Sequence, residues 1–388
     1  MVSLGLQEFL KKPEFYKNSK LGLLVHPASV DAHLNHSLDR IMEHADINVI
    51  SVFGPQHGIY GETQDNMVEW EGFRDKQSGK PVFSLYGRHR KPTRAMLKDI
   101  DLLIIDLQDI GARYYTFIWT MALCMEACAV FGKKVIILDR PNPINGISLE
   151  GGLLNQEFAS FVGLYPLLMR HGMTIGEIAL YLNGEFNLNC ELEIVPMQGW
   201  RRNYRFEKTG LHWVIPSPNM PTLDTAAVYP GMCLLEGTNL SEGRGTTRPF
   251  EIFGAPFVNG RVLAKKLKSY GLPGVFFRPI TFIPTFQKWA GVCCGGIQIH
   301  VLNRDEFRPV ATACRILQAV KEEYKDKFCW KKPPYEYENK KMPIDILSGS
   351  KFLRETLDKK KDIGEVLVLW EKEAGIFSDT RGKYLLYK

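Results

Sequence analysis

The sequence lacks the features that mark several classes of protein. No apolar run approaches the roughly 18 residues of a membrane span, and charged residues interrupt segment 1–20, so we expect neither a transmembrane helix nor a signal peptide. The eight cysteines form no C-x-x-C pair and show no zinc-finger spacing. Reduced thiols in a cytoplasmic protein are therefore the simplest interpretation, and no metal is expected.

A strong excess of charge is also missing. The formal net charge is +6 over 388 residues, and Lys and Arg are spread along the chain without the focused stripe that binding of a phosphate backbone requires. The phosphate-loop pattern G-x-x-x-x-G-K-[ST] is absent, and 243–245 lacks the third glycine of a dinucleotide fingerprint. We therefore expect no nucleic-acid partner, no membrane partner and no cofactor.

Short, continuous apolar runs dominate the first half of the chain. Runs of Val, Ile and Leu with little alternation are typical of strands buried on both faces, as in a parallel sheet covered by helices. Such strands are predicted at 21–25, 49–53, 82–85, 102–106 and 135–139. Segments with helical signals follow at 37–44, 91–98 and 116–131. The pattern predicts a doubly wound α/β domain.

The character of the chain changes after Tyr229. Gly- and Pro-punctuated segments surround a predicted strand at 296–301 and a predicted helix at 309–327. The length is that of two typical domains. We predict an N-terminal domain over 1–228 and a second, smaller α+β domain over 229–388.

Polar residues gather where the predicted strands end, the edge at which open parallel sheets bind ligands. The loop 54–65 is rich in glycine, so its backbone can turn sharply toward a ligand. The alternative is a Gly-Pro turn with solvated acids. Its site candidates are Gln56, His57, Glu62 and Asp65.

A second strand-end loop covers 106–113. Asp106 closes a very apolar strand, so it is either a desolvated functional carboxylate or a cap for the next turn. Arg113 either forms a structural ion pair with Asp106 or Asp109, or holds an anionic ligand. All three are candidates for the site.

A third strand-end loop covers 139–145. Two prolines fix its backbone, which leaves Asp139, Arg140 and Asn142 positioned at low entropic cost. Asn142 is equally suited to an ordinary turn in which it bonds its own backbone.

Segment 235–251 has the densest chemistry. Its two arginines, three carboxylates and several hydroxyls alternate with glycines, which is typical of a loop that binds a polyhydroxylated or anionic ligand. Its candidates are Asn239, Glu242, Arg244, Thr246, Thr247, Arg248 and Glu251. The proline-rich loop 216–222 is predicted to be rigid, and its Asn219 could reach a sugar hydroxyl or acetamido group.

Five strings in these loops are specific enough to indicate a family. They are FGPQHG at 53–58, DLQDIGARYYT at 106–116, LDRPNP at 138–143, SPNMPTLDTA at 217–226 and EGTNLSEGRGTTRPFE at 236–251. Through them the chain resembles the exo-β-N-acetylmuramidase (NamZ-like) glycoside hydrolases over nearly its whole length. The resemblance implies a Rossmann-like N-terminal domain, a smaller C-terminal domain, and a saccharide site in the cleft between them.

The resemblance also implies the reaction, which is removal of N-acetylmuramic acid from the non-reducing end of peptidoglycan fragments. The missing export signal then favours recycling of imported wall fragments in the cytoplasm. Relatives commonly have Glu where this chain has Gln56, and an amide cannot exchange a catalytic proton as a carboxyl does. A non-catalytic protein that binds amino sugars or muropeptides is therefore the alternative.

Glycoside hydrolysis needs a proton donor and usually a second carboxylate. We predict Glu62 as the acid/base, with Asp65 as its substitute, and Glu242 or Asp106 as the second carboxylate; the 2-acetamido group of the substrate could replace the latter. Arg244 or Arg248 is predicted to grip the lactyl carboxylate. The remaining candidates are predicted to bind substrate: Gln56, His57, Asp109, Arg113, Asp139, Arg140, Asn142, Asn219, Asn239, Thr246, Thr247 and Glu251. Stereochemistry and oligomeric state stay open.

Overall fold

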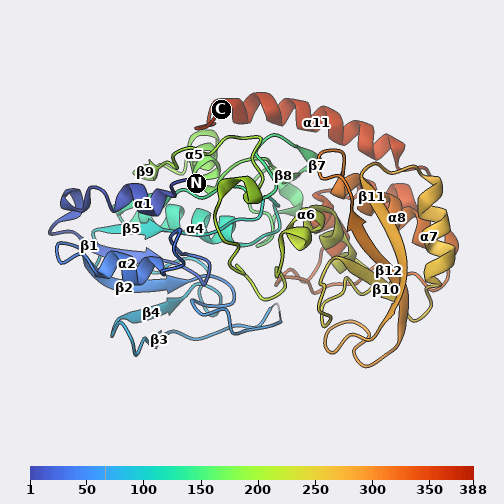
Figure 1. Cartoon of the computed structure of the whole chain (residues 1–388), viewed down its shortest axis with the longest axis horizontal. Coiled ribbons are helices and arrows are strands. Elements are labelled where there is room, and N and C mark those ends of the chain that lie inside the picture. The colour runs from blue at the N-terminus through green and yellow to red at the C-terminus, as the bar shows by residue number, and fades with distance from the viewer. Residues whose placement is uncertain (66) are drawn as a thin grey trace.

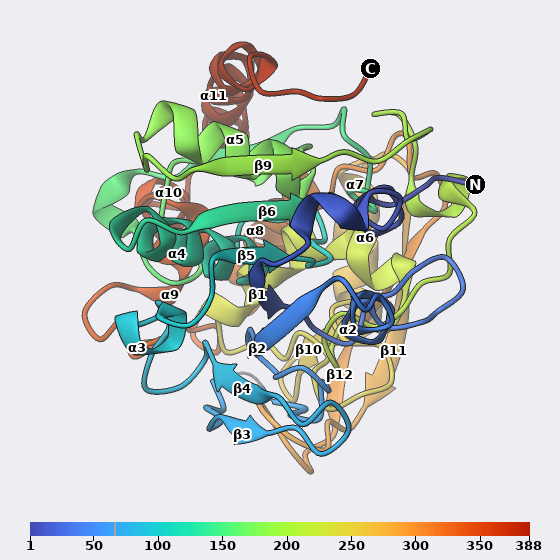
Figure 2. The same ribbon diagram turned by 90° about the vertical axis from the view of Figure 1, so that its left-hand side faces the viewer.

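A seven-stranded, mostly parallel sheet forms the centre of the N-terminal half in the computed structural model, which describes residues 1–65 and 67–388 (Figure 1). The strand order is β3-β4-β2-β1-β5-β6-β9, and only the edge strand β3 is antiparallel to its neighbour. Figure 2 shows the strands one above another in this order. Their bounds are β1 (Lys20–Leu24), β2 (Asn48–Gly54), β3 (Phe73–Arg74), β4 (Pro81–Ser84), β5 (Leu102–Ile105), β6 (Lys134–Leu138) and β9 (Leu192–Val195). The five predicted strands are all present.

Helices cover both faces of this sheet, which explains the continuous apolar runs. In β5, Leu103 and Ile105 pack into the layer of α4 and α5, while Leu102 and Ile104 face α1 and α2. Both sets of side chains are removed from water, so the strand needs no polar face. The helices of this half are α1 (Gly5–Phe9), α2 (Ser37–Met42), α3 (Arg94–Leu97), α4 (Phe117–Val130) and α5 (Ile175–Glu185), with 3-10 turns η1 (Pro13–Tyr16), η2 (Gln156–Phe158) and η3 (Phe206–Thr209) and a hairpin of β7 (Glu150–Leu153) and β8 (Leu168–Arg170). This is the predicted doubly wound, Rossmann-like domain.

A smaller antiparallel sheet organises the second half, in the order β10-β12-β11. Its strands are β10 (Ile252–Ala255), β11 (Val275–Phe282) and β12 (Cys294–Val301). Its helical elements are α6 (Leu223–Met232), η4 (Cys233–Gly237), α7 (Gly260–Ser269), α8 (Pro309–Glu323), α9 (Pro343–Ser348) and α10 (Phe352–Asp358). The predicted α+β character is confirmed, with β12 and α8 at the positions expected from the sequence.

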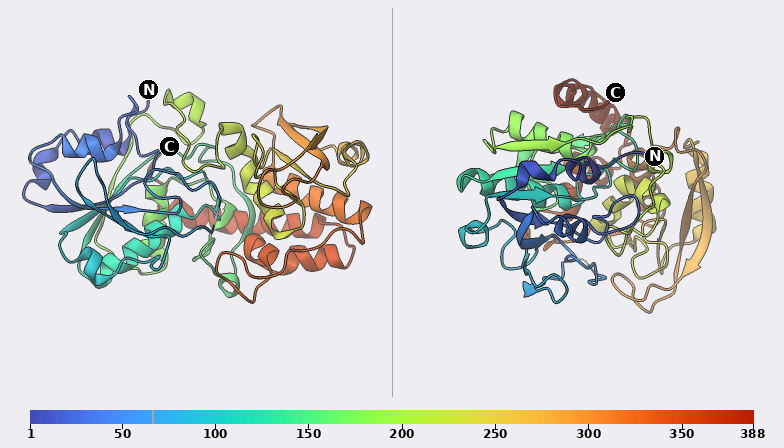
Figure 3. Two further views of the ribbon diagram at one scale, coloured as in Figure 1. Left: turned by 90° about the horizontal axis from the view of Figure 1, so that it is seen from below. Right: turned by 60° about the vertical axis from the view of Figure 1, so that its left-hand side comes forward.

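The last helix, α11 (Gly364–Gly382), runs back from the second half toward the first, as the red helix in Figures 1 and 3 shows. Trp370 is buried beside Gly152 of β7, and the Glu373 carboxylate accepts a hydrogen bond of 2.8 Å from the Leu153 amide. The end of the chain therefore completes the N-terminal half. The predicted boundary at residues 228 and 229 falls inside α6 and stays a prediction.

Within 1–65 and 67–388, no helix combines the length and the apolar character that crossing a membrane would require.

Candidate active site

A pocket lies where loops at the carboxyl ends of β2 and β5 meet loops of the second half. The N-terminal half contributes the loop after β2, the start of α4 and the loop before α6, and the second half contributes η4, the glycine-rich loop after it, and the loop after α8. The lining residues are Gln56, His57, Tyr114, Tyr115, Thr116, Phe117, Val162, Ser217, Asn219, Met220, Tyr229, Glu236, Arg244, Phe250, Tyr335 and Glu336. The pocket is thus placed as the rule for open parallel sheets predicts.

The loop after β2 places an amide and a neutral imidazole in the pocket wall. The Oε1 atom of Gln56 accepts a hydrogen bond of 2.8 Å from the Thr116 hydroxyl at the start of α4. His57 Nδ1 donates to the Thr63 carbonyl over 2.7 Å, which sets its tautomer. Burial, helped by the nearby Arg244 charge, lowers the pKa of His57 to about 4. His57 is therefore uncharged at neutral pH.

An ion-paired carboxylate faces the pocket from η4. The Glu236 carboxylate accepts hydrogen bonds from Arg244 Nη2 at 2.9 Å and from the Tyr335 hydroxyl at 2.8 Å. Burial alone would raise the pKa of Glu236, but the Arg244 charge and these hydrogen bonds outweigh it and hold the pKa below its usual value. Glu236 is therefore ionised at neutral pH.

The glycines around Arg244 shape the loop that holds it. Gly243 and Gly245 adopt φ of 82° and 77°, in the left-handed region that favours glycine. A Cβ atom on Gly245 would lie 2.7 Å from the backbone nitrogen of Phe286. Both positions therefore need glycine, which is the physical reason for the Gly-Arg-Gly string seen in the sequence.

A second carboxyl group, Glu336, reaches the pocket from the loop after α8. Burial raises its pKa to about 7, and the negative charge of Glu236 acts in the same direction. Its Oε2 atom accepts a hydrogen bond of 3.1 Å from the Tyr86 hydroxyl, which opposes this rise only in part. The pocket thus holds one carboxyl group with a lowered pKa and one with a raised pKa.

Three pocket residues have an unusual backbone. His57, Phe250 and Glu336 adopt φ of 70°, 64° and 45°, in the left-handed region that residues with a Cβ rarely occupy. Such strain persists only when surrounding structure enforces it, and it clusters at functional sites.

Four predicted site residues line this pocket: Gln56, His57, Asn219 and Arg244. Asn219 Nδ2 donates to the Gln64 carbonyl over 2.8 Å, so it also holds the loop after β2. Asp65 lies just behind, where it accepts a hydrogen bond from Gln287 and its charge acts on His57.

The two glutamates favoured as catalytic groups lie elsewhere. Glu62 is exposed and does not line the pocket. Glu242 is buried beneath the pocket wall, 2.9 Å from Lys288 Nζ and 3.4 Å from Arg244 Nε. Glu242 thus pairs with Arg244 and does not line the pocket.

The loop after β5 turns its polar side chains toward partners inside the protein. Asp106 is completely buried in an ion pair with Arg140 and accepts a hydrogen bond from Ser37. Asp109 accepts from the Gly111 amide over 2.7 Å. Arg113 donates to three carbonyls, of Gly152, Leu167 and Leu347, each at 2.7 Å. None of these side chains lines the pocket.

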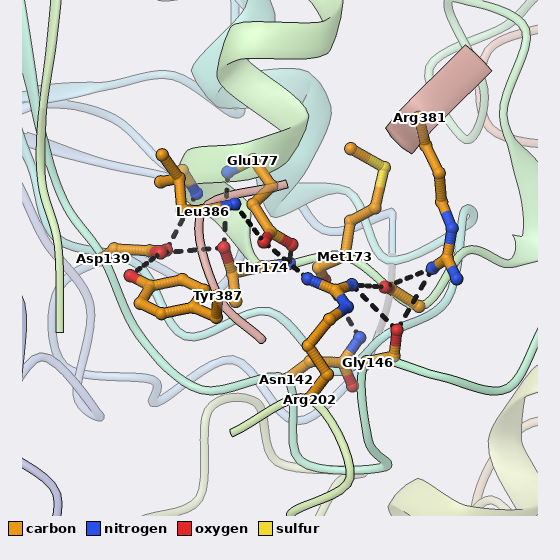
Figure 4. Close-up of polar contacts among 12 residues, drawn as sticks. Asp139, Asn142, Gly146, Met173, Thr174, Glu177, Arg202, Arg381, Leu386 and Tyr387 are labelled. Atoms are coloured by element: carbon orange, nitrogen blue, oxygen red, sulfur yellow. Dashed lines mark hydrogen bonds and ion pairs between the residues drawn. The ribbon is translucent and has the colours of Figure 1, made fainter. Parts of the chain in front are cut away.

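The polar side chains of the loop after β6 also bond partners inside the protein (Figure 4). Asp139 accepts hydrogen bonds from the Thr174 hydroxyl at 2.7 Å and the Tyr387 hydroxyl at 2.5 Å. The Asn142 amide donates to the Met173 carbonyl over 3.0 Å, and its Oδ1 accepts from the Ile144 amide, which is the ordinary turn interpretation. Asp139 thus holds the C-terminal tail through Tyr387.

The rest of the dense segment supports the loop itself. Asn239 bonds the backbone of Lys327 and Cys329 at 2.8 and 3.0 Å. The Thr246 hydroxyl donates a hydrogen bond to the Gly243 carbonyl, and Thr247 is exposed. Neither residue lines the pocket. The exposed Arg248 pairs at 3.2 Å with the buried Glu251.

Sequence reasoning missed Glu336 and passed over Glu236. Glu236 stands in the dense segment, so its signal was present, but nothing distinguished it from Glu242 and Glu251. Glu336 follows Pro333, Pro334 and Tyr335 in a polar stretch. Two prolines before an aromatic residue and an acid were the available signal for a rigid, positioned loop.

Known proteins match the whole chain. The family models for Exo-beta-N-acetylmuramidase NamZ match at residues 21–224 (N-terminal) and 227–387 (C-terminal). The Peptidoglycan beta-N-acetylmuramidase NamZ of Bacillus subtilis (strain 168) is 43% identical over 389 residues, covering 100% of this chain and 91% of that protein. Crystal structures of two DUF1343 family proteins from Bacteroides fragilis NCTC 9343 superpose with TM-scores of 0.90 and 0.78 at 35% and 27% identity, each covering 100% of this chain and 99% of the other.

Proposed function

Because the chain belongs to the exo-β-N-acetylmuramidase NamZ family, as its motifs predicted, we propose that it removes β-linked N-acetylmuramic acid from the non-reducing ends of peptidoglycan fragments. One observation carries the proposal for this chain: Glu236, Glu336 and Arg244 converge in a single pocket. Two carboxyl groups are what glycoside hydrolysis usually requires, and a buried guanidinium can bind the carboxylate of an acidic sugar.

The walls of the pocket suit a sugar ring. Tyr115, Tyr229 and Phe250 provide aromatic faces, and Asn219 and Gln56 provide polar groups that fix orientation. Arg244 lines the pocket and is the proposed partner of the lactyl carboxylate, whereas Arg248 is exposed and pairs with Glu251. We therefore transfer the catalytic roles expected for Glu62 and Glu242 to the carboxyl groups that face the pocket.

A small, muramic-acid-containing fragment is the proposed partner, and recycling of wall fragments in the cytoplasm is the proposed setting. All eight cysteines lie in the part of the chain that the structure describes, and all are free thiols. Free thiols suit a reducing compartment.

The test uses purified protein and 4-nitrophenyl β-N-acetylmuramide, with the matching N-acetylglucosaminide as control substrate. We expect nitrophenol release from the muramide only. Glu236→Gln should lower kcat by about 10²-fold or more, because the charge that faces the developing cation is lost. Glu62→Gln is the matched control and should retain wild-type activity, since Glu62 is exposed and outside the pocket.

One result would favour the alternative function. If the protein binds N-acetylmuramic acid but hydrolyses neither the chromogenic glycoside nor a muramic-acid-terminated disaccharide, it is a saccharide-binding protein. Gln56 is the residue that would argue for that outcome, because an amide occupies the place of a proton-exchanging group.

A further inference from the structure

Among the residues that the structure describes, the N-terminal wall of the pocket contains no carboxylic acid. Gln56 carries an amide there, and its oxygen is engaged by Thr116. His57 is neutral and donates its Nδ1 proton to a backbone carbonyl. Among the described residues that line the pocket, Glu236 and Glu336 are the carboxyl groups, and both come from the second half. The proton donor must therefore be sought there.

We propose that Glu336 is the general acid that protonates the leaving-group oxygen, a role that rests on the proposed glycosidase function. Glu336 is 4% exposed, lines the pocket and accepts a hydrogen bond from Tyr86. Glu336 lies in the loop after α8, whereas Gln56 lies in the loop after β2.

The backbone around Glu336 is built to hold it in place. Tyr335 and Glu338 exchange two backbone hydrogen bonds of 2.9 Å, which close a two-residue turn over Glu336 and Tyr337. Both turn residues have positive φ, 45° and 66°, the conformation that such turns usually assign to Asn-Gly. A glutamate and a tyrosine are strained there. The turn directs Glu336 into the pocket while the neighbouring Tyr335 bonds Glu236.

Burial favours the protonated form of Glu336, and the charges around it act in both directions. Glu236 from η4 raises the pKa of Glu336, whereas the Tyr86 hydroxyl, Arg244 and Arg90 lower it, and burial decides the balance at about 7. Glu236 itself stays ionised because Arg244 pairs with it. When neighbouring carboxyl groups are separated in this way, the protonated one is suited to be the acid and the ionised one to stabilise positive charge.

The proposed step is balanced as follows. The Glu336 proton moves to the glycosidic oxygen while the bond between that oxygen and C1 breaks, so the bonding electrons leave with the alcohol. Positive charge develops at C1 and the ring oxygen, facing the Glu236 carboxylate. A water molecule then forms the new bond to C1 and gives its proton to the Glu336 carboxylate, which restores the acid.

The experiment compares Glu336→Gln with wild type on two substrates. One is a muramic-acid-terminated disaccharide, whose sugar leaving group needs a proton, and the other is 4-nitrophenyl β-N-acetylmuramide, whose leaving group needs much less help. We expect kcat/KM to fall by about 10²- to 10⁴-fold on the disaccharide, and far less on the nitrophenyl glycoside. The alkaline limb of the wild-type pH profile, near pH 7, should disappear in the variant.

Two further variants separate a chemical from a structural effect. Tyr86→Phe removes the hydrogen bond that favours the ionised form of Glu336, so the alkaline limb should move to higher pH. Glu338→Gln changes an acid in the same turn that lies outside the pocket, and it should behave as wild type.

The outcomes are distinguishable. Equal losses of Glu336→Gln on both substrates, or no loss on either, would overturn the role of Glu336 while wild-type turnover leaves the glycosidase function standing. If the wild-type protein hydrolyses neither substrate, the proposed function fails and the role of Glu336 fails with it.

Discussion

His57 shows at the scale of a single residue how burial sets charge. Its pKa in the folded chain is about 4, against 6.5 for an ordinary histidine. Between these values the unfolded chain binds a proton that the folded chain does not, so stability rises with pH across this window. The contribution of His57 is complete above pH 6.5 and is lost as the pH falls through 4.

We predict that His57→Asn flattens this part of the stability profile. Asparagine tolerates the left-handed backbone of this position but does not titrate. Between pH 6.5 and pH 4 the free energy of unfolding of the wild type should fall by up to about 3 kcal/mol because of His57, and the variant should not show this fall. Urea unfolding at a series of pH values measures both profiles. Parallel profiles for the two proteins would show that His57 titrates normally in the folded state.

At the scale of elements, the C-terminal tail lies against the end of β6 and the start of α5 (Figure 4). The Leu386 amide donates to Glu177 over 2.9 Å, and the Tyr387 hydroxyl, besides donating to Asp139, accepts from the Met197 amide over 2.9 Å. Asp139 therefore receives one of its hydrogen bonds from a tyrosine 248 positions later in the chain.

We predict that Tyr387→Phe lowers the free energy of unfolding by about 1–3 kcal/mol, because a buried carboxylate and a buried amide each lose a partner. Tyr384→Phe is the matched control, since its hydroxyl bonds the more exposed Glu185 and its loss should cost less. Chemical denaturation measures both. Equal stability of the two variants would mean that the tail contact with Asp139 contributes little. Activity should persist in both, since neither tyrosine lines the pocket.

At the scale of the whole molecule, α11 ties the two halves together. Trp370 is 3% exposed, and its indole lies so close to Gly152 that a Cβ atom there would be 2.4 Å from Nε1. The pocket also requires the two halves to stay in contact. Its residues Gln56 and His57 come from one half, and Glu236, Arg244 and Glu336 come from the other.

Trp370→Ala should destabilise the whole chain by about 3–5 kcal/mol, the cost of emptying a buried aromatic site. Leu369→Ala, on the exposed side of the same helix, should change stability by no more than about 0.5 kcal/mol. Urea unfolding followed by both fluorescence and circular dichroism would measure this. A Trp370 variant as stable as the Leu369 variant would show that α11 does not hold the halves together.

The sequence by itself determined the architecture and the family. Continuous apolar runs such as 102–105 are typical of a strand covered on both faces, so their place in the sheet was readable without coordinates. The strand-end rule likewise led to the pocket, and to Gln56 and His57 in its wall. Arg244 came from the glycine-rich segment 235–251, and Asn219 came from the proline-rich loop 216–222.

Only the tertiary structure decided which acids face the pocket. Asp106, Asp139, Glu236 and Glu336 are alike as carboxyl groups, and each is buried. The first two are satisfied by Arg140 and by the C-terminal tail, whereas the last two share the pocket with Arg244. The role of a buried carboxyl group depends on the charges and donors within a few ångströms of it, and here folding brings those partners from distant positions in the chain.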